Sequence, residues 1–327
     1  MPPPPSPLRA HAARVLWAHA WLVAVLLAAL LLARLVAHDA TWPLLVANQF
    51  SVWLYAPIWL VGLTAWVWQR RRLAIVATPV MLWHLSLLAP WLPRTPPPAC
   101  GPALSVLSAN LLMVHPAPAA LAEEVFAADV DVVLLQELSP LWEAVLDDRG
   151  LFLGWPEGWR VVREDSFGSA ILSRLPLDSA EELDVTGLPQ THATITWDGR
   201  TIALFNVHTL PPRTSEYAAL HREGLDVVAA WVHAHAAAGE AFVLGGDLNA
   251  APYSRFFRDI AGVADDAWDL AGHGFGFTWP NGIFPLPPTR LDHVIVSRDL
   301  TVTNVTVGIG DGSDHRPLRV EVAARCK

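Results

Sequence analysis

Lysine is almost absent from this 327-residue chain: the one lysine is Lys327, and arginine supplies the other basic side chains. Acidic residues are almost absent from residues 1–98, which hold seven arginines and the single acid Asp39. Residues 99–327 therefore carry 15 basic and 30 acidic groups, a net charge near −15, whereas the first 98 residues are near +6. Tight, nonspecific binding to a polynucleotide needs many Lys and Arg side chains, so the acidic part of the chain is poorly suited to it.

Cysteine is scarce too, since only Cys100 and Cys326 occur. They stand near the two ends of the acidic part of the chain. In an oxidising compartment they can form a disulfide that joins both ends of one domain, provided that the terminal strands are neighbours. Two free thiols at frayed ends fit the sequence equally well, so both states stay open.

Proline and glycine mark the organisation of the chain. Residues 1–14 begin with a Pro-rich stretch and are predicted to be a disordered cytoplasmic tail. A Pro/Gly-rich segment at 93–102 is predicted to be a linker. Residues 103–327 are long enough to bury a sizeable core and are predicted to form a separate domain.

Long apolar runs fill residues 15–92, at about 15–36, 44–68 and 73–92. A helix needs about 20 apolar residues to cross the hydrocarbon core of a bilayer, whereas a secretory signal peptide has an apolar region of about 7–15. A buried bundle of a soluble protein is the alternative, but almost no charge interrupts the runs. The sequence therefore predicts three transmembrane helices in contact with the lipid bilayer, flanked by interfacial tryptophans.

Arginines predict the orientation of these helices. Arg9 and Arg14 precede the first run, and three arginines at 70–72 separate the second run from the third. Positive charge favours the cytoplasmic side of a membrane. We therefore expect a multi-pass cell-membrane protein in which an odd number of spans places residues 99–327 outside the cytoplasm. Two arginines oppose this arrangement because they fall on its outer side: Arg34, which snorkelling can accommodate, and Arg94.

The acidic part of the chain alternates strand-like and helix-like patterns. Such alternation predicts an α/β sandwich and not an all-β domain. The predicted strands are 104–109, 130–136, 168–172, 201–207, 241–244, 294–297, 300–307 and 318–322, and the predicted helices are 119–128 and 215–238.

Polar side chains cluster near apolar runs in the last quarter of the chain, as Asp247 with Asn249, then Asp292, then Asp314 with His315. Side chains at strand ends are delivered to one edge of a sheet, which is where α/β folds build active sites. Converging Asp and His groups can bind a hard divalent cation and move protons.

Seven short motifs follow one another along the acidic part of the chain, namely Ser108-Ala109-Asn110, Leu135-Gln136-Glu137, Gly168 to Arg174, Asn206-Val207-His208, Gly246 to Ala250, Leu291-Asp292-His293 and Ser313 to Pro317. Together they resemble one family, the endonuclease/exonuclease/phosphatase superfamily with the deoxyribonuclease I-like fold, which includes members with membrane spans before the domain. The resemblance covers roughly residues 104–322. It implies a four-layer α/β sandwich of two packed mixed sheets and Mg²⁺-dependent hydrolysis of phosphate esters.

The resemblance implies three residues for the metal. Glu137 becomes the main ligand, with Asn110 beside it and Asp314 contributing. Taken alone, Glu137 fits a salt-bridged acid equally well, and Asn110 is more often a turn residue. Mg²⁺ prefers such oxygen ligands, with Mn²⁺ as the alternative. Leu112 is apolar where some relatives carry a further acid, which favours one metal ion.

The same resemblance implies five catalytic residues. Asp247 orients and deprotonates the attacking water, and Asn249, two residues on, holds that water or a phosphate oxygen. Asp292 on one nitrogen of His315 fixes the tautomer and stabilises the charged ring, so that His315 donates to the phosphate or transfers a proton. His208 is the second histidine on the phosphoryl oxygens.

Substrate contacts are assigned to three further residues. By resemblance, the loop with Trp279 lies beside the active site, where its ring either packs on substrate or anchors the loop. Arg174 and Arg213, together with Arg163 and Arg316, are candidates for a local basic patch.

The remaining histidines are given no catalytic role. His293 is predicted to be structural beside Asp292. His233 and His235 are two residues apart on a predicted helix and cannot share a face, so a metal pair is excluded there. Four others are predicted to be surface or loop residues: His115, His192, His221 and His273.

Charge and resemblance together predict a membrane-anchored, metal-dependent phosphoesterase acting on a phospholipid or small phosphoester. Hydrolysis of DNA or RNA is the alternative, because a local basic patch is enough for it. No clear tyrosine lies near the middle of the domain, which disfavours a repair nuclease, since some DNA-repair relatives use one on phosphate. A non-catalytic binding domain on the same fold is the third hypothesis, weakened because every acid and histidine of the motifs is present.

Overall fold

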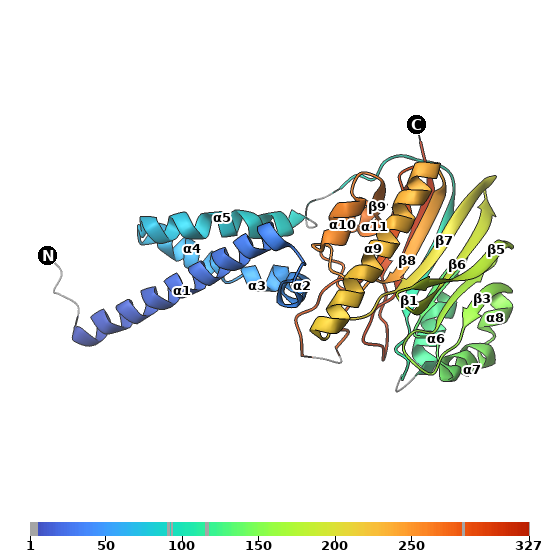
Figure 1. Ribbon diagram of the computed structural model, residues 1–327, viewed down its shortest axis with the longest axis horizontal. Coiled ribbons are helices and arrows are strands. Elements are labelled where there is room, and N and C mark those ends of the chain that lie inside the picture. Colours follow the sequence, from blue (N-terminus) through green and yellow to red (C-terminus); the bar gives the residue numbers. More distant parts are fainter. Residues whose placement is uncertain (1–5, 90–91, 93, 115–117, 283–284, 327) are drawn as a thin grey trace. The chain divides into compact units, whose positions relative to one another are not determined.

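The change in composition near residue 90 coincides with a structural boundary. The computed structural model describes residues 6–89, 92, 94–114, 118–282 and 285–326. Contacts divide the chain into two units, Met1–Ala89 and Pro90–Lys327, drawn in Figure 1. His115 lies outside the described residues.

The N-terminal unit is helical. Its first helix, α1 (Pro7–Ala37), has 31 residues, and only 17% of its most apolar window is buried. Such a helix is suited to be a membrane anchor or a signal sequence. The second predicted span is divided between α2 (Trp42–Gln49) and a stretch comprising α3 (Ser51–Tyr55) and α4 (Ile58–Val67), with a bend of 83° between the two parts.

The last helix of this unit, α5 (Arg71–Leu87), covers most of the third predicted span with 17 residues. About 20 are needed for an untilted crossing of a typical bilayer. Within the described residues, one helix is therefore long and apolar enough to span a membrane, or two if the bent pair counts as one span.

Arg34 was expected to snorkel from the end of the first span, but it is buried inside the N-terminal unit. Its guanidinium donates to Asn48 and, at 2.8 Å, to Ser51 Oγ, and it lies 4.9 Å from the ring centre of Trp83. Asn48 in turn donates to Asp39. Because these groups satisfy Arg34 within the unit, this arginine is weak evidence about orientation.

Two six-stranded sheets form the C-terminal unit (Figure 1). Sheet A has the order β11-β12-β1-β2-β4-β3, and sheet B has the order β5-β6-β7-β8-β10-β9. Sheet A consists of β1 (Ala99–Asn110), β2 (Val132–Gln136), β3 (Glu157–Val161), β4 (Ser169–Ser173), β11 (Leu300–Val307) and β12 (Leu318–Arg325). Sheet B consists of β5 (Leu177–Val185), β6 (Leu188–Trp197), β7 (Arg200–His208), β8 (Ala241–Asp247), β9 (Ala264–Asp266) and β10 (Asp292–Ser297).

The two sheets pack face to face with helices outside both, which confirms the predicted four-layer α/β sandwich. One apolar cluster lies between the sheets and includes Val106, Leu134, Leu204 and Val243. A second covers the outer face of sheet A beneath α6 (Pro118–Ala127), α7 (Pro140–Asp148) and α8 (Leu151–Gly154). A third covers the outer face of sheet B beneath α9 (Ser215–Ala238) and α10 (Arg255–Ile260); the short α11 (Ala267–Ala271) packs beside β10 and β11.

Alternation along the strands explains this layering. In β2, Val132 and Leu134 face sheet B, whereas Val133 and Leu135 face the outer helices. A strand that is buried on both faces has a continuous apolar run and not an alternation of apolar and polar residues. Such runs are why these strands could be predicted from the sequence. Helix α9 has its predicted bounds because Thr214 caps its first turn and Gly239 ends it in the left-handed conformation.

Strand β1 begins at Ala99, inside the segment predicted as linker. It pairs with β12, so the two terminal strands are neighbours, and Cys100 and Cys326 form a disulfide with their Cα atoms 5.2 Å apart. Of the two states that the sequence left open, the structure has the disulfide. Four strands were not predicted, namely β3, β5, β6 and β9.

Candidate active site

The layer between the sheets changes from apolar to polar towards one edge. Ile202 and Leu204 of β7 face this layer, and Asn206 and His208 follow on the same face, two and four residues after Leu204. The other central strands repeat the pattern, with Ser108 and Asn110 on β1, Gln136 on β2, Asp247 on β8 and Asp292 on β10. The strand-end residues singled out in the sequence therefore share one face at one edge.

Asp247 is the centre of this group. In the register of sheet B, it lies opposite His208 of β7 on one side and Asp292 of β10 on the other. Its Oδ2 accepts from Asn110 Nδ2 at 3.1 Å and Asn249 Nδ2 at 3.2 Å, and its Oδ1 accepts from the Asn249 backbone N–H at 2.8 Å. Asp247 is thus held by both sheets.

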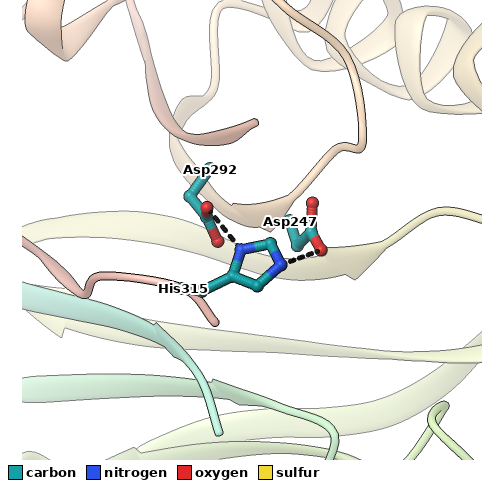
Figure 2. A group of neighbouring side chains, drawn as sticks. All are labelled: Asp247, Asp292 and His315. Atoms are coloured by element: carbon teal, nitrogen blue, oxygen red, sulfur yellow. Dashed lines mark hydrogen bonds and ion pairs between the residues drawn. The ribbon is translucent and has the colours of Figure 1, made fainter. Parts of the chain in front are cut away.

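His315 lies between two carboxylates, as Figure 2 shows. Its Nδ1 bonds Asp292 Oδ2 at 2.8 Å, and its Nε2 lies 3.6 Å from Asp247 Oδ2. The ring comes from the loop before β12, which Ser313 fixes by donating to the Asn110 carbonyl and accepting from the His315 backbone N–H. The predicted Asp292–His315 pairing is present.

Burial and charge set the protonation of this group. Burial lowers the pKa of His315, but the Asp292 and Asp247 carboxylates outweigh it and raise that pKa to about 10, so the ring is an imidazolium at neutral pH. Burial raises the pKa of Asp247 to about 6, against the opposing effect of His315. The pKa of His208 is lowered, chiefly by burial, although its Nε2 is 3.5 Å from Asp247 Oδ2.

Glu137 follows β2 at the same edge. Its Oε2 accepts from the Met113 backbone N–H at 2.7 Å and its Oε1 from Asn110 Nδ2 at 3.3 Å. Burial raises the pKa of Glu137, with the nearby charge of Asp314 acting in the same direction. Its backbone has a φ of 61°, a left-handed conformation that is strained for a residue with a Cβ and that occurs preferentially at functional sites.

Asp314 and Trp279 lie together beside this carboxylate. Trp279 Nε1 donates to Asp314 Oδ2 at 3.2 Å. Thr278 accepts from the backbone N–H groups of Leu291 and Asp292, which ties the loop to the start of β10. The loop therefore lies beside the group of acids, and Trp279 is bound to one of them.

Sequence and fold comparisons agree with this geometry. Residues 107–315 match the Endonuclease/Exonuclease/phosphatase family, which is most of the chain. The chain belongs to this family. None of the curated protein sequences matches it closely enough to count as a relative.

Solved structures of the family have the same fold. TDP2 from Caenorhabditis elegans is 20% identical, with a TM-score of 0.57 over 68% of this chain and 74% of that one. D. rerio TDP2 complexed with single strand DNA product is 18% identical, with a TM-score of 0.57 over 68% and 99% of the two chains. The endonuclease/exonuclease/phosphatase from Beutenbergia cavernae is 18% identical, with a TM-score of 0.55 over 68% and 72%.

Members of the Endonuclease/Exonuclease/phosphatase family are typically metal-dependent, and the residues here fit a hard divalent cation. Carboxylate and amide oxygens predominate, and the raised pKa values of Glu137 and Asp247 show that their negative charge is incompletely compensated. Two groupings offer ligands: Glu137 with Asn110 and Asp314, and the compact group Asp247, Asp292 and His315, whose ligand atoms lie within 4.8 Å of one another.

The second grouping is the poorer ligand set. An imidazolium carries protons on both ring nitrogens and has no lone pair for a metal. His315 is in that state at neutral pH, with one N–H engaged by Asp292 and the other side facing Asp247. Both carboxylates of this grouping thus have the imidazolium as a direct neighbour.

A buried polar layer beneath the site was missed by the sequence reasoning, although its three polar side chains, Gln136, Ser169 and Asn206, stand in the quoted motifs. Asn206 donates to Ser169 Oγ and to the carbonyls of Leu135 and Ala170, and accepts from Gln136 Nε2 at 2.6 Å. These bonds join β7 of sheet B to β2 and β4 of sheet A. A buried amide at an otherwise apolar strand position is the signal that could have identified it.

One of the four arginines of the predicted patch lies away from the site. Antiparallel pairing sets Ser169 of β4 beside Gln136 at the site edge, so Arg174, after the other end of β4, lies at the opposite edge. There it pairs with Asp129 at 2.7 Å and covers the Trp155 ring, so its assignment to the substrate site is corrected. Arg213 is exposed on the loop that follows His208, and Arg163 pairs with Asp165.

His293 has the buried, structural position that was predicted. It bonds Asp266 at 2.6 Å on the face of β10 opposite Asp292, because neighbouring residues of a strand point to opposite faces. Two other histidine predictions change. His192 and His221 were expected at the surface, yet both are buried, one on β6 and the other on the inner face of α9. His273 is exposed on a loop as predicted.

Proposed function

We propose that this chain is a membrane-anchored, Mg²⁺-dependent phosphoesterase that hydrolyses a phospholipid or small phosphoester by attack of an activated water. The observation that carries the proposal is the meeting of Asp247, Asp292, His315, His208 and Glu137 at one edge of the two sheets. Family membership supports phosphoester chemistry.

Asp247 is the proposed general base. Its raised pKa brings it nearer to the working pH, where proton transfer to a carboxylate is most effective. It accepts a proton from water while the water oxygen forms a bond to phosphorus and the bond to the leaving oxygen breaks. Asn249, which already donates to Asp247, orients this carboxylate and the water beside it.

His315 and His208 are the proposed partners of the phosphoryl oxygens. The imidazolium of His315, held by Asp292, places a fixed positive charge where negative charge develops. His208 is neutral and donates one hydrogen bond to the phosphate. Trp279 and Arg213 are the proposed substrate contacts, as both lie beside the site or on the loop that leaves it.

Glu137, Asn110 and Asp314 would hold the cation. A bound Mg²⁺ would neutralise phosphate charge and polarise the phosphorus–oxygen bonds. Placing it here leaves the ion pair of Asp292 and His315 intact. Mn²⁺ fits the same oxygen ligands.

The N-terminal unit is the proposed anchor, with α1, the bent pair and the shorter α5 as three membrane crossings that would place the catalytic domain outside the cytoplasm. The exposed apolar surface of α1 supports insertion, because large side chains such as Leu22, Leu26 and Leu32 are more than half exposed. The disulfide between Cys100 and Cys326 supports an oxidising compartment. Protease treatment of intact cells would contradict this orientation if residues 99–327 were protected.

The test is hydrolysis by the full chain in detergent of phospholipids, a small diester, a small monoester, DNA and RNA, each with Mg²⁺ and with chelator. Asp247→Asn is expected to lower kcat roughly 100- to 10,000-fold. The matched control is Asp226→Asn, which removes an exposed acid of α9 paired with Arg255. Turnover that survives Asp247→Asn or chelation would contradict the mechanism, and no turnover by a folded chain would favour a non-catalytic binding domain.

Nucleic acid is the second candidate substrate. It is favoured by the likeness to the D. rerio structure, which holds a single strand DNA product. The net charge near −15 of residues 99–327 opposes tight binding to a polynucleotide. Preference for DNA over phospholipid in the panel would establish this alternative.

A further inference from the structure

A basic pocket opens in the N-terminal unit, far along the chain from the catalytic residues. Its volume is about 620 Å³. It lies where the start of α1 meets the turn between α4 and α5. Four arginines and two tryptophans account for most of its lining, namely Arg14, Arg70, Arg71, Arg72, Trp17 and Trp21.

No carboxylate of this unit neutralises these arginines. The only acid in residues 1–98 is Asp39, which follows the other end of α1 and accepts a hydrogen bond from Asn48. Arg14 and Asp39 are separated by most of a 31-residue helix, roughly 35 Å at 1.5 Å per residue. The arginines therefore give the pocket a concentrated positive charge, which is suited to bind an anion that is not part of this unit.

Backbone groups add to this charge. Helix α5 begins at Arg71, its N-cap residue Arg70 makes no side-chain cap, and its first turn contains no acid. The first N–H groups of a helix and the positive end of its dipole attract anions, so the start of α5 supplies donors at the same pocket. Arg70 also stacks over Trp17, with its guanidinium 4.9 Å from the ring centre, which holds this side chain at the pocket wall.

An apolar groove of about 660 Å³ adjoins the basic pocket. Gln69 and Arg71 line both, so the two lie side by side. The groove runs between α4 and α5, and its other lining residues are nearly all apolar: Ala65, Trp66, Ala74, Ile75, Thr78 and Pro79. A ligand that fills both sites needs an anionic head joined to a hydrocarbon chain.

We propose that the N-terminal unit binds one anionic phospholipid, with its phosphate among the arginines and an acyl chain in the groove. This rests on the membrane anchorage proposed above. In that orientation the arginines are cytoplasmic, where anionic lipids attract clustered Lys and Arg. The lipid is therefore a structural ligand of the anchor and not the substrate of the extracytoplasmic domain.

The test is lipid retention by the purified full chain in detergent, measured by native mass spectrometry with phosphatidylglycerol or phosphatidylcholine. Phosphatidylglycerol is expected to bind at least tenfold more tightly. Arg14→Gln should weaken it about fivefold, and Arg14→Gln with Arg70→Gln roughly 25-fold. The matched control is Arg9→Gln, which removes the same charge from an exposed site of α1 outside the pocket and should change binding less than twofold.

The groove has its own variant. Thr78→Phe fills it without changing charge and should weaken phosphatidylglycerol at least threefold, whereas Leu82→Phe, one turn further along α5 and exposed, should not. Equal binding of both lipids, or equal effects of Arg9→Gln and Arg14→Gln, would overturn the proposal. Inorganic phosphate that binds as tightly as phosphatidylglycerol would overturn it too, because the pocket would then be a simple anion site.

Alkaline carbonate extraction of membranes separates the two proposals. A chain released by carbonate would refute membrane anchorage itself. A chain that stays in the membrane but does not prefer phosphatidylglycerol would refute the lipid site alone, and phosphoester turnover of the same preparation would be unaffected.

Discussion

Two buried carboxylate–imidazole pairs lie on opposite faces of β10, and they differ in what surrounds them. Asp292 bonds His315, while the next residue, His293, bonds Asp266. The second pair is complete: His293 Nε2 bonds the Ala250 carbonyl at 2.9 Å, and Arg290 reaches Asp266 at 2.7 Å. In the first pair, Nε2 of His315 faces the Asp247 carboxylate, and the acids Glu137 and Asp314 are nearby.

Charge balance shows the same difference. Burial alone would raise the pKa of Asp266, but the charges of Arg290 and His293 outweigh it and hold that pKa well below its usual range. The pKa of Asp247 is raised instead. A buried pair with a full set of partners is a stabilising element, whereas a pair with surplus negative charge is suited to bind a cation and transfer protons.

The largest expected effect is on catalysis. Asp292→Asn should lower kcat on the best phosphoester roughly 1,000- to 10,000-fold, because His315 loses the partner that fixes its tautomer and charge. Steady-state kinetics of this variant measure the effect on catalysis, and its melting temperature measures the effect on stability. If Asp292→Asn lowered the melting temperature but left kcat unchanged, the Asp292–His315 pair would be a stabilising element and not a catalytic one.

Asp266→Asn should act on stability instead. It leaves Arg290, which is 2% exposed, without its main partner, and the free energy of unfolding should fall by about 3–5 kcal/mol. Urea unfolding of the full chain in detergent measures this loss. The kcat of the remaining folded protein should stay within threefold of the wild type, and a larger fall would tie this pair to the chemistry.

His221 is another buried histidine, and no carboxylate among the described residues pairs with it. Its Nδ1 donates to the Leu210 carbonyl at 2.9 Å, and burial lowers its pKa to about 4. The unfolded chain takes up the proton near pH 6.5 but the folded chain does not, so the stability contribution is full above pH 6.5 and is lost as the pH falls towards 4. Between pH 7 and pH 5 this amounts to about 2 kcal/mol.

The variant His221→Asn isolates this part of the pH dependence. Urea unfolding at both pH values should show a smaller difference for the variant than for the wild type. An unchanged difference would mean that other groups account for the acid sensitivity.

Arg174→Gln should have the smallest effect, less than twofold on kcat/KM, since Arg174 lies at the far end of β4 with Asp129. Arg213→Gln, on the loop after His208, should raise KM several-fold if the substrate is anionic. Kinetics of both variants on one substrate make the comparison. A larger effect of Arg174→Gln would restore it as a substrate contact.

The α/β sandwich and the site residues at the strand ends could be predicted from the sequence. Strands buried on both faces, such as β2 and β8, have unbroken apolar runs, and the polar residues that follow them, Glu137 and Asp247, mark where they end. Because side chains alternate along a strand, Asp247 and Asp292 can both be assigned to the face between the sheets without knowing the distance between them.

Pairing between distant segments could not be predicted in this way. The position of Arg174 depends on β4 running antiparallel to β2, and the partner of His293 is a residue 27 positions away in the sequence. β5 was missed because its sequence mixes charged and apolar residues along the edge of sheet B, and β6 was missed because polar residues interrupt its apolar positions. A sequence period reports which face a residue occupies and not which strand lies beside it.

Sheet A also constrains the order of events during synthesis. β1 lies between β2 and β12, and 207 residues separate Asn110 from Leu318. At about 5–20 residues per second, one edge of β1 waits roughly 10–40 s for its partner while the rest of the domain is made. An emerging chain thus exposes one unpaired edge of β1 for that time, which gives a chaperone a defined segment to protect.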